Sequence, residues 1–241
     1  MQTLSPSTRT LASAGLVAGA LGFTVADLVR RLVEPANPTP ETLARTAGAY
    51  VGAWLAAGLL SALLPFLVLP GLGLLALGVR GRGARVVRVG AGLLGVGSIA
   101  ASVHASGYFG MYDVLARSDV DPATVRAVDS ASESSPFFVP FIALFMAGML
   151  LGPIVLAAGL RRARLVPVWA PVAAVVFAVA GGTGGVAAGV VGMVAFVALA
   201  ASVARALPLA SQDARAEHRG LRPSVGTVGR VVQPGDAALP R

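Results

Sequence analysis

The amino-acid sequence predicts an all-α integral membrane protein, a polytopic bundle of six transmembrane helices with both chain termini in the cytoplasm. Of the 241 residues 56% are hydrophobic and only 12% are charged, and the mean hydropathy is +0.78, which is typical of a chain solvated by lipid. Several apolar runs are long enough to cross a bilayer core of about 30 Å. Arginine clusters recur between these runs, as expected for cytoplasmic loops.

The residue types that the chain lacks exclude much chemistry. There is no lysine and no cysteine, which excludes a Walker-type phosphate loop, a Schiff-base amine, a thiolate metal site and a disulfide. The two histidines, His104 and His218, lie far apart and in different surroundings, so a multi-histidine metal centre is not expected. We therefore predict no catalytic residue, metal site or cofactor, and we expect that the protein is not an enzyme.

The first predicted span covers about 11–33 and follows a single arginine, Arg9. Such a run could be a cleavable signal peptide or a retained signal anchor. The small residues Ala18 and Ala20 fit a cleavage site only loosely, so the sequence favours a retained anchor.

The second apolar block, 42–79, is too long for one straight crossing and contains two prolines. It could form one kinked span after a surface segment, or two spans. A single crossing places the arginine-rich stretch that follows it on the same side as a second arginine cluster at 161–164. We therefore predict one kinked span over about 46–79. Thr39 is expected to cap a short helix before it, with Pro40 at the first helical position.

The last apolar block, 166–207, is about twice the length that one helix needs, and the stretch GGTGG breaks it in the middle. Residues 1–208 thus form the predicted transmembrane domain, with spans at about 11–33, 46–79, 86–110, 136–160, 166–181 and 185–207. The remainder, 209–241, has no apolar period and several prolines and glycines, so we predict a disordered cytoplasmic tail.

The distribution of charge supports this orientation. The predicted outer segments hold most of the acidic residues, namely Asp27, Glu34, Glu41, Asp113, Asp119, Asp121, Asp129 and Glu133, whereas most arginines fall on the predicted inner side. We expect a multi-pass protein of the cell membrane, with the lipid bilayer as its first partner and no nucleic-acid partner.

One stretch, SVHASGYFGMYD, carries a candidate site. His104, Tyr108 and Tyr112 follow one another at steps of four residues, so they share one face of a continuing helix. Asp27 reaches a similar depth, close to Arg30 and Arg31 in the sequence. One hypothesis is an outward-facing polar pocket that binds a small ligand or senses pH, formed by Asp27, His104, Tyr108, Tyr112 and Asp113. The alternative is an ordinary interfacial aromatic belt with a self-paired helix end.

Small residues recur at helical spacing, at Gly15 and Gly19, Gly48 and Gly52, Gly148 and Gly152, and Gly181, Gly185 and Gly189. Such pairs let helix backbones approach closely, either within one bundle or in a homo-oligomer, and the sequence favours packing within the bundle. The outer stretch DVLARSDVDPATVRAVDSASESSP, 113–136, holds five acidic residues and could be a calcium site. It lacks the EF-hand pattern, so a solvated surface with Asp121 capping a helix at Pro122 is favoured.

The stretch GPIVLAAGLRRARLVPVWAP joins an apolar helix to an arginine-rich step and then to Val-Pro-x-Trp at the start of the next helix. In this the chain resembles a broad group of six-helix actinobacterial membrane proteins of unassigned function. The resemblance covers about 11–207 and implies a fold and a location, and it implies no catalytic residue.

Two classes of function remain open. The first is a non-catalytic membrane component, such as a sensor, an accessory subunit or a partner-binding protein, which could act with a membrane-protein partner or as a homo-oligomer. The second is a transporter or exporter of a small apolar or cationic compound. Ion-coupled transporters usually place ionisable residues or broken helices at mid-membrane. The predicted spans have no ionisable residue at their centres, which favours the first class.

Overall fold

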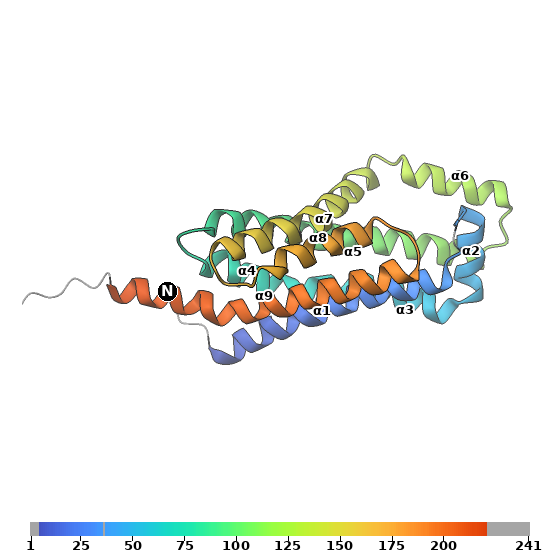
Figure 1. Ribbon diagram of the computed structural model, residues 1–241. Coiled ribbons are helices and arrows are strands. Elements are labelled where there is room, and N and C mark those ends of the chain that lie inside the picture. The colour runs from blue at the N-terminus through green and yellow to red at the C-terminus, as the bar shows by residue number, and fades with distance from the viewer. Residues whose placement is uncertain (1–4, 36, 221–241) are drawn as a thin grey trace, which may run out of the picture.

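The computed structural model describes residues 5–35 and 37–220. Within them every regular element is helical, and the long helices lie side by side in one elongated bundle (Figure 1). Five helical segments of the described chain are long and apolar enough to cross a membrane, and a shorter apolar helix accompanies them. The predicted fold class, an all-α membrane helix bundle, is confirmed.

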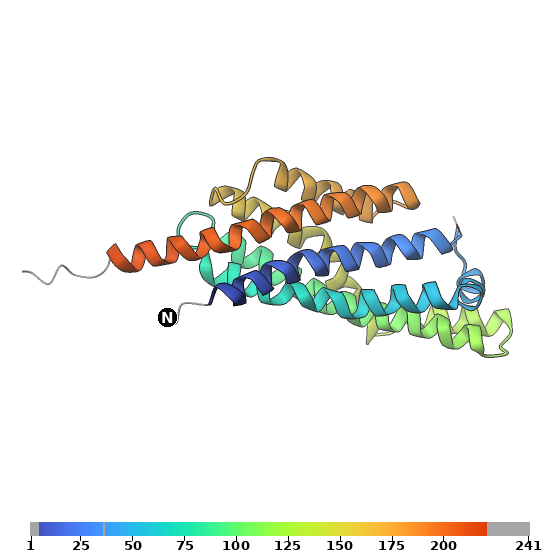
Figure 2. The same cartoon turned by 90° about the horizontal axis from the view of Figure 1, so that it is seen from below.

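Both ends of the described chain lie at the same end of the bundle (Figures 1 and 2). This arrangement fits an even number of crossings. Following the predicted orientation, we call this end the inner end, and we call the opposite end, which carries α2 and α6, the outer end.

The first helix, α1, spans Pro6–Val33. Ser5 caps it by accepting a hydrogen bond from the backbone N–H of Thr8 at 3.2 Å, and Pro6 occupies a position that needs no donor. The next helix, α2, spans Pro40–Ala49 and has a capping box between Thr39 and Thr42. The predicted cap at Thr39 is therefore confirmed, and α2 is a separate short helix at the outer end.

The second span is broken in the middle. It consists of α3 (Val51–Leu63), the 3₁₀ segment η1 (Leu64–Val68) and α4 (Leu69–Gly78), which together form a continuous apolar stretch of 28 residues. Pro65 has no N–H to donate, so the α-helical ladder gives way to a tighter turn here, as the prolines predicted. Glycines on α1 let η1 approach closely, since a Cβ on Gly15 would lie 2.6 Å from the carbonyl oxygen of Leu67.

The helices α5 (Ala84–Arg117) and α7 (Phe138–Arg162) form the most intimate pair in the bundle. A Cβ on Gly148 would lie 2.4 Å from Gly97 Cα, which shows that the two backbones touch at this level. The predicted pairs at 15 and 19 and at 148 and 152 therefore pack within the bundle. A Cβ on Gly52 would meet no atom of another described helix within 4 Å, and a homo-oligomer stays a prediction.

The last two helices form a hairpin. It consists of α8 (Trp169–Gly181) and α9 (Val186–Gly220), joined at the GGTGG stretch, where Gly185 has a φ of 87° that favours glycine. The α8 helix has only 13 residues, or about 20 Å of helix. The predicted disordered tail begins at 209, whereas α9 continues to Gly220, because 209–219 contain no glycine or proline and are rich in helix-forming residues. The rest of that tail, 221–241, lies outside the described residues.

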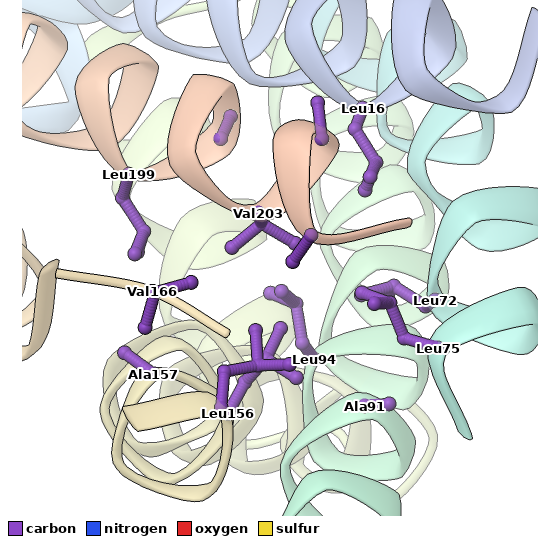
Figure 3. Close-up of a cluster of buried hydrophobic side chains, with 14 of the residues drawn as sticks. Leu16, Leu72, Leu75, Ala91, Leu94, Leu156, Ala157, Val166, Leu199 and Val203 are labelled. Atoms are coloured by element: carbon purple, nitrogen blue, oxygen red, sulfur yellow. The ribbon is translucent and has the colours of Figure 1, made fainter. Parts of the chain in front are cut away.

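Two apolar clusters stabilise the bundle. The larger one, at the inner end, joins α1, α4, α5, α7, α8 and α9 through side chains that include Leu16, Leu75, Leu94, Leu156 and Val203 (Figure 3). The smaller one lies at the outer end and is centred on Trp54, Phe109 and Tyr112. There α6 (Pro122–Glu133) contributes Val125, so α2, α6 and the ends of α3 and α5 form what we call the outer head.

Candidate functional site

A cavity of about 310 Å³ lies in the outer half of the bundle. Six helices contribute to its wall, α1, α3, α5, α7, α8 and α9. Most of the lining is apolar and includes Phe23, Phe145, Met149, Phe177 and Met193. Polar groups gather on part of the wall, namely Asp27, Arg30, Arg31, Ser61, His104 and Tyr108. The cavity is thus amphipathic, as small-molecule sites usually are.

The charged groups of the wall are paired with one another. The Asp27 carboxylate accepts hydrogen bonds from Arg30 at 2.8 Å and from Arg31 at 2.7 Å, because these residues follow it at i+3 and i+4 on α1. Arg30 also binds Glu34, and the Tyr108 hydroxyl donates to Glu34 at 2.9 Å. Two arginines therefore face two carboxylates, and this network has no net formal charge.

Arg31 connects the network to the α8–α9 turn. Its guanidinium donates to the carbonyl oxygens of Thr183 at 2.6 Å and Gly185 at 3.2 Å. The Arg31 side chain is only 7% exposed, and a Cβ on Gly189 would come within 2.8 Å of its Cδ. Glycine at 189 therefore leaves room for the arginine. In this way the wall of the cavity formed by α8 and α9 is fastened to α1.

Two polar side chains face the cavity without a hydrogen-bond partner in the described part of the chain. The His104 ring stacks on Phe145 with centroids 5.3 Å apart and an interplanar angle of 20°, and neither of its nitrogens is engaged there. The Ser61 hydroxyl also has no hydrogen-bond partner among the described residues, although Ser61 is only 8% exposed. Thr24 differs, because its hydroxyl donates to the Ala20 carbonyl at 2.8 Å. His104 and Ser61 are therefore the groups that a ligand could engage.

The structure divides the five residues of the predicted pocket. Asp27, His104 and Tyr108 all line the cavity. Tyr112 lies in the outer head, where its ring packs against Trp54 and its hydroxyl donates to Asp129 at 2.6 Å. Asp113 pairs with Arg117 at 2.9 Å. Neither Tyr112 nor Asp113 lines the cavity.

The cavity also contains residues that the sequence did not predict, among them Ser61 and Phe145. Ser61 had a weak signal, since it is a single hydroxyl in a long apolar block. Phe145 and the α8–α9 wall had none, because only the packing of distant segments brings them to His104.

Polar contacts outside the spans hold the outer head together. Asp121 accepts hydrogen bonds from the Thr124 hydroxyl at 2.8 Å and from the amides of Thr124 at 3.0 Å and Ala123 at 2.8 Å, and these bonds lower the pKa of Asp121. The predicted cap at Asp121 is confirmed. A further contact, between Arg126 and Glu41, joins α6 to α2. In the described residues no group of three or more histidine, aspartate or glutamate side chains is placed to hold a metal ion.

Comparison of the chain with protein-family models, with curated proteins and with solved structures finds no match. The resemblance to a group of six-helix actinobacterial proteins therefore stays a prediction.

Proposed function

We propose that this integral membrane protein is a non-catalytic binding component, of the sensor or accessory type, whose outer cavity takes a small, uncharged, lipid-soluble ligand. The observation that carries the proposal is the pair of unengaged polar groups, His104 and Ser61, in a cavity that is otherwise apolar. Both groups face the cavity from a largely apolar wall, so a ligand with a hydrogen-bonding head would give both of them a partner.

The charge network favours an uncharged ligand. Every charged side chain of the cavity wall is already paired, through Asp27, Arg30, Arg31 and Glu34. An ionic ligand would have to separate these pairs or remain unpaired in a partly buried site, and either outcome is costly. The aromatic and methionine side chains would instead accept the apolar part of the ligand.

The broken second span gives less support to the alternative, a transporter. Transporters typically place their broken helices at the binding site. Here η1 packs against α1, and the second span contributes only Ser61 to the cavity wall. The binding proposal therefore has the stronger basis.

Identification of the compounds that remain bound after purification in mild detergent tests the proposal. Ala188 lines the cavity and Ala198 lies farther along the same helix, so A188F fills the site and A198F is its matched control. We expect one compound, detected by mass spectrometry, to accompany the wild type and A198F and to be lost from A188F. Absence of any stoichiometric compound, or equal retention by A188F, would contradict ligand binding. Flux of the identified compound through reconstituted protein would favour the transporter.

A further inference from the structure

A second pocket lies at the inner end of the bundle, away from the outer cavity. It has a volume of about 290 Å³ and lies between the α4–α5 loop and the end of α7. Three arginines line it, Arg82 and Arg85 from one segment and Arg162 from the other. Distant parts of the chain thus bring three guanidinium groups to one place.

A close contact of the backbone fixes this arrangement. Gly83 has a φ of 92°, and a Cβ at this position would lie 2.5 Å from the carbonyl oxygen of Gly159. The α4–α5 loop is therefore pressed against the last turn of α7. As a result, Arg82 and Arg85 on either side of Gly83 are held beside Arg162.

No acidic side chain between residues 5 and 207 balances these charges. Between residues 5 and 207 all aspartates and glutamates belong to the outer end of α1 or to outer segments of the chain. None of the three arginines has an ion pair with a described residue. The first turn of α5 contains no acidic residue either, so the positive end of the helix dipole adds to the repulsion.

We propose that this inner pocket binds a phosphate group, and that its source is the headgroup of an anionic phospholipid. Planar guanidinium forks match phosphate oxygens and form short, charge-assisted hydrogen bonds with them. The arginines stand where the apolar parts of α5 and α7 end, which is the level of lipid phosphates. A bound phosphate would neutralise the repulsion among the three side chains.

Thermal unfolding of the full chain in mild detergent tests this inference, with phosphatidylglycerol, phosphatidylcholine or inorganic phosphate as the added probe. The variant R82Q/R162Q removes two charges from the pocket. Its control, R164Q/R205Q, removes two charges at the same end from residues that do not line the pocket. We expect phosphatidylglycerol, but not phosphatidylcholine, to stabilise the wild type and the control. The apparent affinity should fall by at least about tenfold in R82Q/R162Q, because each lost charge-assisted bond is worth about that factor.

Each outcome of this test has a clear meaning. Stabilisation by inorganic phosphate as strong as that by phosphatidylglycerol would keep the phosphate site and overturn the lipid as its source. Equal stabilisation by both lipids, no response to any probe, or equal loss of affinity in both double variants would overturn the site itself. The result does not depend on the outer cavity, because no substituted residue lines it.

Discussion

At the scale of single residues, Arg31 and Arg117 form ion pairs of the same helical spacing but differ in how much they contribute to stability. Each arginine follows an aspartate by four residues on a helix, Asp27 in one case and Asp113 in the other. The Arg31 side chain is 7% exposed and also binds two backbone carbonyls of the α8–α9 turn, whereas the Arg117 side chain is 60% exposed. Because it is buried and makes these added contacts, Arg31 should contribute more to the free energy of unfolding than Arg117.

We therefore expect R31Q to destabilise the folded bundle by about 3 kcal/mol, since it removes one of the two donors of the Asp27 carboxylate and the donor of two backbone carbonyls. The matched variant R117Q should cost less than about 1 kcal/mol, as is usual for exposed pairs. The free energies of unfolding, measured in mixed detergent micelles with increasing denaturing detergent, compare the two variants. Equal losses would show that the link to the α8–α9 turn contributes nothing.

At the scale of helices, the contact between α5 and α7 depends on glycine. Side chains at 97 and 148 are absent where the two backbones meet, so dispersion contacts form along the whole pair. Gly92 lies on the same α5 helix, but a Cβ on it would meet no atom of another described helix within 4 Å. It supplies an internal reference for substitutions.

The variant G148L should push α5 and α7 apart and destabilise the bundle by about 1–3 kcal/mol or more. In contrast, G92L adds a side chain where there is space and should leave the free energy of unfolding unchanged or slightly improved. Unfolding in the same detergent mixture measures both. A loss of stability in G92L as large as that in G148L would mean that helix contacts beyond this bundle matter at that position.

The α6 helix should respond to acid through its cap. The pKa of Asp121 is lowered in the folded protein below its ordinary value of 3.8, so its contribution to α6 is complete above that pH and is lost as the pH falls through the folded pKa. The protection factors of the α6 amides, which correct for the slower intrinsic exchange in acid, should accordingly fall at acidic pH. The variant D121N should largely remove this pH dependence. The control D119N alters a nearby aspartate that does not cap α6, so it should retain the pH dependence.

At the scale of the whole molecule, the orientation of the bundle is directly testable because the chain contains no cysteine. Single cysteines at Arg82 and Ser130 would lie at opposite ends, in the α4–α5 loop and on α6. We expect a membrane-impermeant maleimide to label S130C in intact cells, and R82C only after the membrane is permeabilised. Labelling of both variants in intact cells would contradict the predicted topology.

The sequence was sufficient for the fold class, because hydropathy and proline positions act locally. Thr39 and Pro65, for example, mark a cap and a break wherever the chain goes. The residues that line the cavity were harder to predict, because positions four residues apart do not point in quite the same direction and the difference grows along the helix. At about 100° per residue, Tyr112 is turned by about 80° from His104, so it packs against Trp54 instead of facing Phe145. The part played by Phe145 depends on the packing of α7 against α5, which no local pattern encodes.

The shortness of α8 has a consequence for the surrounding bilayer. Its 13 residues give about 20 Å of helix, against a hydrocarbon thickness of about 30 Å. Lipids beside α8 must therefore compress their acyl chains, or headgroups and water must descend toward the glycine turn, and both adjustments carry a cost from hydrophobic mismatch. The thinned annulus would adjoin the side of the cavity formed by α8 and α9, so membrane thickness itself would influence how readily a dissolved ligand enters.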